Sequence, residues 1–162
     1  MLTLITGIPN AGKTTYSQQF DNVIHLDDVP CRKGHGHIRT VCEMLQGTTD
    51  DVCVEGVFLI AHYRKMLVRA VGDMPKRCIW LDTPLDECIR REDRHRNTCI
   101  VRNSQAVFQP PTYDEGWDEI IVVKDGKEGL LETSNTHSPL ERGTVGDVPF
   151  AEQPCSSASG QL

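Results

Sequence analysis

The sequence predicts an α/β fold of three layers, in which helices cover a mainly parallel sheet of five strands. Short apolar runs alternate with helical or glycine-containing segments along the first 124 residues. These runs are continuously apolar and do not alternate with polar residues, which is typical of parallel strands that are buried on both faces. The predicted strands are residues 2–6, 23–26, 52–54 with 57–60, 77–82 and 119–123.

Helices are predicted between these strands. In residues 38–47, Val41, Met44 and Leu45 fall on one helical face, as expected for a helix that packs on a sheet. Pro84 precedes the last helix, where the fixed φ of proline suits a helix start. The predicted helices are residues 12–20, 38–47, 61–72 and about 85–95.

Composition predicts one folded domain of the cytoplasm, without a membrane partner. The chain has 162 residues, of which 38% are hydrophobic and 25% are charged, and its net charge is −6. No apolar run approaches the roughly 18 residues of a membrane helix, and the first residues lack the basic start of a signal peptide. The seven cysteines form no CxxC pair, so buried free thiols are expected and a disulfide framework is not. The oligomeric state stays open.

The character of the sequence changes after Lys124. Residues 125–162 are rich in Gly, Ser, Thr, Pro and acidic residues and contain few large apolar side chains. Such a segment buries too little apolar surface to offset the entropy of ordering it. We therefore expect a folded domain over residues 1–124 and a disordered tail over 125–162.

Residues 7–14 read G-I-P-N-A-G-K-T and match the phosphate-loop pattern GxxxxGK[ST], after an apolar strand and before a helix. Glycines let the backbone wrap phosphate oxygens with its N–H groups inward, and the helix N-terminus adds positive charge. Lys13 is expected to reach the β- and γ-phosphates of ATP, and the Thr14 hydroxyl to ligate Mg²⁺. A chance glycine turn is the alternative, which the full match to the pattern between a strand and a helix disfavours. The predicted P-loop NTPase fold binds ATP through Gly7, Pro9, Asn10, Ala11, Gly12, Lys13, Thr14 and Thr15.

Three further segments follow the phosphate loop in order: HLDD at 25–28, LDTPLDECIRREDRHR at 81–96 and FQPPTYDEGWDEI at 108–120. With GIPNAGKTT, they make the chain resemble the polynucleotide-kinase-like branch of P-loop kinases, over about residues 1–124. The NKxD-type base reader of GTPases is absent from the sequence. The resemblance implies an ATP-dependent kinase with a helical lid, and an adenine pocket framed by residues 110–112.

The resemblance assigns the general base to Asp27, which follows the second predicted strand. Ligands of open α/β sheets bind beyond the carboxyl ends of strands, and a carboxylate there can accept the proton of an attacking hydroxyl. Asp27 or Asp28 is also suited to closing a turn. The family's arginine for the acceptor phosphate is replaced by Cys31, so Arg32 or Arg39 would have to substitute, unless these are solvated loop charges.

Glu55 ends an apolar strand and is a candidate for supporting Mg²⁺ through water, for holding the attacking hydroxyl or for pairing with a lid arginine. Arginines on the lid are expected to neutralise the transferring phosphate. The resemblance favours Arg91 and Arg94 for this role. A solvated helix, with Glu87 and Arg91 paired at i,i+4, is the alternative.

These features predict an ATP- and Mg²⁺-dependent phosphotransferase that acts on a hydroxyl acceptor. The first candidate acceptor is the 5′-hydroxyl of a nucleic-acid end. The acidic net charge and the cysteine at position 31 argue against it, so a small-molecule or nucleoside kinase is a serious alternative. A regulatory ATPase without efficient transfer is a third possibility.

Overall fold

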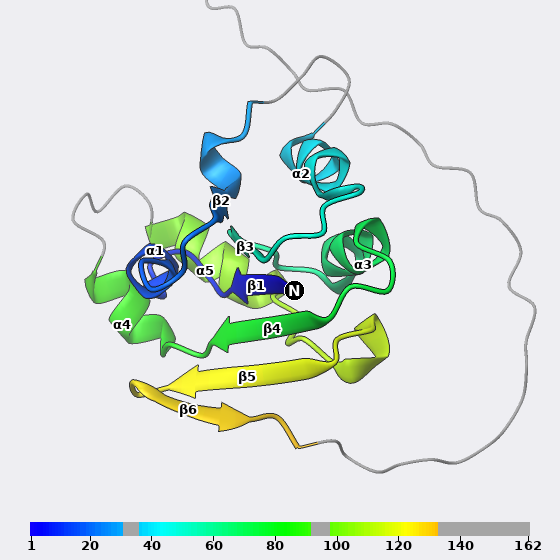
Figure 1. Cartoon of the computed structure of the whole chain (residues 1–162). Helices are drawn as coiled ribbons and strands as arrows, with labels where there is room; N and C mark the ends of the chain where they lie inside the picture. Colours follow the sequence, from blue (N-terminus) through cyan, green and yellow to red (C-terminus); the bar gives the residue numbers. More distant parts are fainter. Residues whose placement is uncertain (31–35, 92–97, 133–162) are drawn as a thin grey trace, which may run out of the picture.

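A computed structural model of the chain describes residues 1–30, 36–91 and 98–132. Its centre is a six-stranded sheet in the order β2-β3-β1-β4-β5-β6 (Figure 1). The first five strands along the chain pair in parallel, and β6 joins β5 antiparallel at one edge. The strands are β1 Leu2–Thr6, β2 Val23–His25, β3 Val52–Glu55, β4 Lys76–Leu81, β5 Glu119–Lys124 and β6 Lys127–Leu130.

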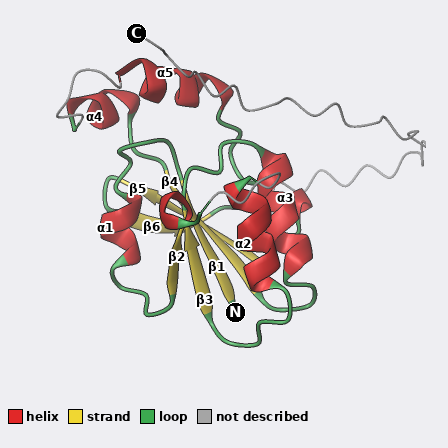
Figure 2. Ribbon diagram, turned by 90° about the horizontal axis from the view of Figure 1, so that it is seen from above, coloured by secondary structure: helices red, strands yellow, loops and turns green. Residues whose placement is uncertain are grey.

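Helices cover both faces of the sheet and confirm the predicted three layers. Side chains of α2 and α3 pack on one face and α1 lies on the other, whereas α4 and α5 lie beyond the ends of the strands (Figure 2). Side chains of α1, α4 and α5 contribute to the second core. The helices are α1 Lys13–Ser17, α2 His37–Leu45, α3 Ala61–Ala70, α4 Leu85–Arg90 and α5 Thr98–Val107, with 3-10 turns η1 Leu26–Asp28 and η2 Tyr113–Glu115.

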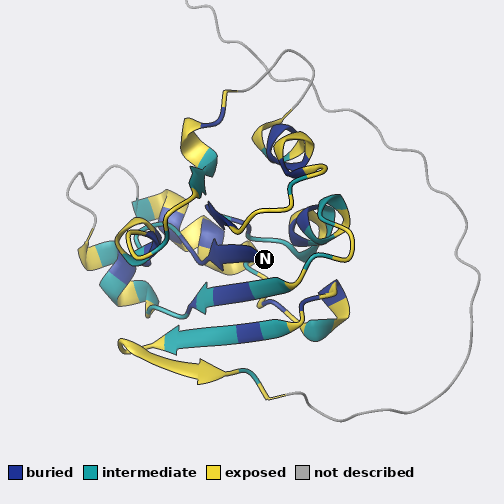
Figure 3. Ribbon diagram, viewed as in Figure 1, coloured by how far each residue is buried: buried dark blue, intermediate teal, exposed yellow. Residues whose placement is uncertain are grey.

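Each central strand contributes to both hydrophobic cores, because successive side chains of a strand point to opposite faces. In β1, Leu4 packs on the α2/α3 side and Ile5 on the other; in β4, Cys78 and Ile79 divide in the same way. All five residues of β1 are buried (Figure 3). Burial on both faces explains why apolar residues occupy successive positions of these strands.

The structure corrects the predicted strand count and the predicted start of the tail. Residues assigned to the tail form β6, which pairs with β5 through the two-residue loop Asp125–Gly126. Both loop residues have positive φ, 51° and 72°, as the favoured two-residue hairpin turns require. The ordered part of the domain therefore continues past Lys124, because pairing with β5 satisfies the backbone groups of β6 that face it. The prediction for residues 133–162 lies outside the described residues.

Two predicted elements also end earlier than expected. The helix predicted over 85–95 stops at Arg90, and the apolar residues 57–60 form a loop instead of extending β3. Phe58 in this loop is fully buried, and its carbonyl oxygen accepts hydrogen bonds from the side chains of Thr6 and Arg64. The run is apolar because it fills the core beyond the end of the strand.

Four cysteines are buried free thiols, as predicted, whereas Cys99 is exposed; Cys31 and Cys155 lie outside the described residues. Within the described ranges, no helix is both long and apolar enough to cross a membrane.

A fully buried ion pair joins α3 to η2. Two guanidinium nitrogens of Arg64 donate to the carboxylate of Glu115 at 2.8 and 2.6 Å, and a third donates to the Phe58 carbonyl at 2.8 Å. Glu115 also accepts a hydrogen bond from the indole of Trp117 and one from the backbone N–H of Thr112. The pair is therefore well compensated, and its loss would leave a buried charge without a partner.

We expect Arg64→Leu to destabilise the fold by about 3–5 kcal/mol, since it leaves the Glu115 carboxylate buried without its countercharge. Urea unfolding followed by circular dichroism measures this change. The double variant Arg64→Leu/Glu115→Leu removes both charges and should recover part of the loss. A single variant within about 1 kcal/mol of the wild type would show that the pair does not hold the two segments together.

Candidate active site

The candidate site lies where the carboxyl ends of the parallel strands meet. Strand β1 is flanked by β3 on one side and by β4 on the other. After β3, the chain therefore crosses β1 and adds its later strands on the opposite side of the sheet, which makes this position a topological switch point. Open α/β sheets bind ligands in the crevice at such a switch point. Here the residues that end or follow the strands are Gly7 after β1, Asp27 after β2, Glu55 in β3, Thr83 after β4 and Asp125 after β5.

The loop between β1 and α1 has the conformation that close wrapping around an anion requires. Asn10 and Gly12 have positive φ values of 64° and 97°. A Cβ atom on Gly7 would lie 2.9 Å from the carbonyl oxygen of Leu81, so only glycine fits between the loop and the end of β4. The phosphate-loop sequence has therefore folded into a tight backbone turn at the predicted place.

Lys13 is buried under this loop, and its Nζ atom donates to the carbonyl oxygen of Ile8 at 2.9 Å. Burial lowers the pKa of Lys13, whereas the negative charges of Glu55 and Asp27 raise it. The ammonium group thus lies within the electrostatic reach of both predicted carboxylates. Lys13, Glu55 and Asp27 therefore form one electrostatic cluster, and their roles at the site remain predictions.

Glu55 is held in place by a neighbour that the sequence reasoning did not single out. The two residues His25 and Glu55 are register partners in the parallel β2–β3 pair, and the Nδ1 atom of His25 lies 2.7 Å from Oε2 of Glu55. The Glu55 side chain is buried, whereas Asp27 in η1 is exposed. The buried carboxylate is therefore fixed, and the exposed one remains accessible to a ligand.

The lid helix α4 contacts the phosphate loop directly. Arg91, just after α4, donates from Nε to Glu87 at 2.8 Å and from Nη1 to the carbonyl oxygen of Asn10 at 3.3 Å. Arg90 also pairs with Glu87. Arg91 therefore contacts the loop and also forms the i,i+4 pair with Glu87 that the solvated-helix alternative predicts. Arg94 lies outside the described residues.

Two more hydrogen bonds fasten the loop to the segment around α4. The Thr83 hydroxyl donates to the carbonyl oxygen of Ala11 at 2.9 Å, and the Asn10 side chain donates to the carbonyl oxygen of Cys88 at 3.2 Å. Thr83 lies in the LDTPLDE segment that suggested a lid, but the sequence does not reveal which carbonyl it meets. These contacts hold the α4 segment against the loop.

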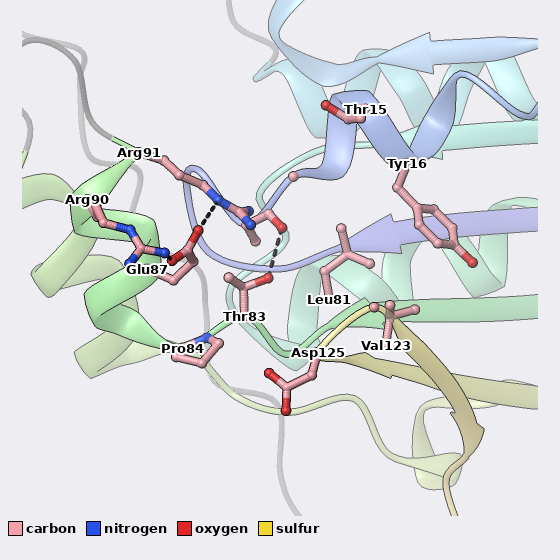
Figure 4. A pocket seen from close by; sticks show the side chains of 13 residues that line it. Thr15, Tyr16, Leu81, Thr83, Pro84, Glu87, Arg90, Arg91, Val123 and Asp125 are labelled. Atoms are coloured by element: carbon pink, nitrogen blue, oxygen red, sulfur yellow. Dashed lines mark hydrogen bonds and ion pairs between the residues drawn. The ribbon is translucent and has the colours of Figure 1, made fainter.

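A pocket of about 630 Å³ opens beside the loop (Figure 4). This volume is within the roughly 300–1,000 Å³ of small-molecule sites. Apolar side chains from the ends of β4 and β5 line it together with the first turn of α1, the start of the lid and the β5–β6 turn. Residues 110–112 do not line it, and their expected role at the adenine stays a prediction. Its lining is Ala11, Gly12, Thr15, Tyr16, Leu81, Thr83, Pro84, Glu87, Arg90, Arg91, Val123, Asp125 and Gly126.

Tyr16 fixes one wall of this pocket to the hairpin. Its hydroxyl donates to the carboxylate of Glu128 in β6 at 2.5 Å. Burial, together with this hydrogen bond, raises the pKa of Tyr16 to about 12, so the hydroxyl keeps its proton at neutral pH. The hairpin that the sequence reasoning assigned to the tail is therefore part of the candidate site.

The oxygen donors at the site suit Mg²⁺. The Thr14 side chain is exposed at the start of α1, and the Glu55 carboxylate lies nearby in the Lys13 cluster. Within the described ranges, no three His, Cys, Asp or Glu side chains are grouped so that they could hold a metal ion. Mg²⁺ commonly binds one or two protein oxygens together with waters and substrate phosphates, so this set fits the ion.

The fold is similar to that of two solved kinases. It is similar to a gluconokinase from Sinorhizobium meliloti 1021, at 12% identity and a TM-score of 0.58, over 75% of this chain and 80% of that one. It is also similar to a sugar kinase from Janibacter sp. HTCC2649, at 16% identity and a TM-score of 0.57, over 75% of this chain and 83% of that one. No protein-family model and no curated protein matches the chain. At these identities the similarity establishes the fold.

Proposed function

We propose that the chain is a kinase that transfers the γ-phosphate of ATP to a hydroxyl group of a small molecule. The observation that carries this proposal is the cluster of Lys13, Glu55 and Asp27 beside the phosphate loop, at the switch point of the sheet. A buried lysine supplies the positive charge that phosphates need, and an exposed carboxylate nearby can receive a proton from an acceptor.

On the ATP side, the backbone of residues 7–14 cradles the phosphates and Lys13 binds the β- and γ-phosphates. Arg91 already contacts the loop, so a small movement of its guanidinium from Glu87 would place it on the phosphates. When Mg²⁺ is bound, it neutralises charge on the phosphates, and Thr14, with Glu55 through water, would hold it. The base extends into the pocket beside α1.

On the acceptor side, Asp27 orients the hydroxyl and takes its proton as the oxygen attacks the γ-phosphate. Glu55 lies in the same cluster, and its contact with His25 holds the carboxylate in place. The acceptor oxygen gains the phosphoryl group, ADP leaves, and the proton passes to Asp27 and then to solvent.

Three observations favour a small acceptor over a nucleic-acid end. Between Asp28 and β3, the described part of the chain offers one helix of nine residues as an acceptor platform. On that helix, Arg39 forms an ion pair with Glu43, 3.8 Å away, so its charge is partly neutralised and is less available to the phosphates of a nucleic acid. The two similar structures are, by name, a gluconokinase and a sugar kinase, and the comparisons give no support to a polynucleotide acceptor.

An acceptor screen tests this proposal. The protein is incubated with Mg²⁺, ATP labelled at the γ-phosphate and, in separate reactions, polyols and sugars, nucleosides or 5′-hydroxyl oligonucleotides. We expect label on a polyol, sugar or nucleoside and none on the oligonucleotides. Label on oligonucleotides alone would contradict the small-molecule proposal and restore the nucleic-acid end as the acceptor. The Asp27→Asn variant serves as the background control.

A further inference from the structure

The β5–β6 turn carries an unused carboxylate at the pocket. Asp125 lines the pocket beside the loop, and within the described part of the chain its carboxylate forms no hydrogen bond or ion pair. The other acidic side chain of the lining, Glu87, is occupied by Arg90 and Arg91. The Thr83 hydroxyl is likewise engaged, with the carbonyl oxygen of Ala11. Asp125 is therefore the lining carboxylate that is free to accept a hydrogen bond from a ligand.

The position of Asp125 relative to the phosphate loop suggests which part of a ligand it meets. The lining runs from Gly12 and Thr15, next to the phosphate loop, to the turn after β5. In Figure 4 the Asp125 carboxylate points toward Pro84, and Leu81 and Thr83 lie between it and Thr15. A nucleotide whose phosphates lie on the loop would extend its base along this apolar floor toward the turn. The edge of the base, and not its phosphates, would then reach Asp125.

We infer that Asp125 selects the donor nucleotide by accepting a hydrogen bond from the exocyclic amino group of adenine. This inference rests on the proposed function, because it takes ATP as the donor. An ionised carboxylate accepts hydrogen bonds and donates none. It therefore binds the N6 amino group of adenine and repels the O6 carbonyl oxygen that hypoxanthine presents at the same edge. The site thus discriminates ATP from ITP, two nucleotides of the same size and phosphate charge.

The wild-type protein provides the first test. Calorimetric titration with Mg²⁺ and ATP or ITP, without an acceptor, measures the two dissociation constants. Asp125 is exposed, so the lower end of the contribution of a hydrogen bond to a charged group applies, and we predict that ATP binds about tenfold more tightly than ITP. Equal affinities for ATP and ITP would overturn the inference and leave the proposed kinase intact. Failure of both nucleotides to bind would contradict the proposed function itself.

The variant Asp125→Asn tests the residue while it keeps the turn, because Asn-Gly and Asp-Gly are both favoured in two-residue hairpins. The amide can donate to O6, so we expect ATP to bind more weakly, ITP more tightly and the ratio to fall within about threefold of unity. Glu132→Gln removes one negative charge just after β6, outside this pocket, and should leave the ratio unchanged. An Asp125→Asn protein with the wild-type ratio would contradict the assignment.

Discussion

Lys13→Met is expected to lower the affinity for ATP by about 10²-fold and to abolish measurable transfer. The ammonium group is buried beneath the loop, where it donates to the Ile8 carbonyl oxygen and lies in the field of two carboxylates. Hydrogen bonds to charged groups contribute about 1.5–3 kcal/mol each, and Lys13 is proposed to bind both the β- and the γ-phosphate. Calorimetric titration with ATP measures the loss of binding. The rate at which γ-labelled ATP is consumed measures the loss of turnover.

Methionine is the informative replacement because the Lys13 side chain is packed as well as charged. Its exposed fraction is only 7%, so alanine would also leave a cavity under the loop. Methionine keeps an unbranched apolar stem of similar length, so it removes the charge with the least change in packing. Lys65→Met, on the partly exposed face of α3, is the control for loss of a charge elsewhere. If Lys13→Met bound ATP with an affinity within about threefold of the wild type, this would contradict the assignment of the ATP phosphates to the loop.

Asp27→Asn is expected to slow transfer by about 10²–10⁴-fold while ATP affinity changes by less than about threefold, since general-base catalysis contributes on this scale. Asparagine keeps the size and the polarity of the side chain but cannot accept the proton of the acceptor. Asp27 is exposed in η1, so the substitution leaves no buried group unpaired. Single-turnover transfer to the acceptor found in the screen, alongside ATP titration, separates chemistry from binding.

The adjacent aspartate provides a matched control. Asp28 lies in the same 3-10 turn and is also exposed, so Asp28→Asn removes the same charge one residue away. We expect Asp28→Asn to retain transfer within about threefold of wild type. If Asp28→Asn and Asp27→Asn lost transfer equally, the effect would come from the charge of the turn and not from a base at position 27. Wild-type transfer in Asp27→Asn would exclude the general-base role.

Local sequence patterns were enough to predict the three-layer fold. Strands β1 and β3 are rich in apolar residues because both faces of each strand are buried, and this pattern is visible without knowing their neighbours. The phosphate loop is likewise local, since eight successive residues define it. The sixth strand is not predicted because the polar composition after Lys124 indicates a disordered tail and outweighs the short hairpin signal at its start. The dipeptide Asp125–Gly126 after an apolar strand is itself a strong hairpin signal.

Pairings between distant segments could not be predicted from the sequence alone. His25 meets Glu55 across 30 residues, and Arg64 meets Glu115 across 51 residues. Neither pair follows a helical or strand period, because each depends on how the chain returns to the sheet. The same holds for Thr83, whose partner is a backbone carbonyl of the phosphate loop. Sequence reasoning therefore identified Lys13, Asp27 and Glu55 as candidates but not the contacts that position them.

The fate of the γ-phosphate is the most direct test of the proposed kinase. The wild-type protein is supplied with Mg²⁺, γ-labelled ATP and the acceptor from the screen, and the label is separated into inorganic phosphate and covalently bound phosphate. We predict that most of the label becomes covalently attached to the acceptor, and that little is released as inorganic phosphate. Release of all the label as inorganic phosphate, whatever acceptor is present, would contradict the kinase and identify a nucleotide-hydrolysing protein instead.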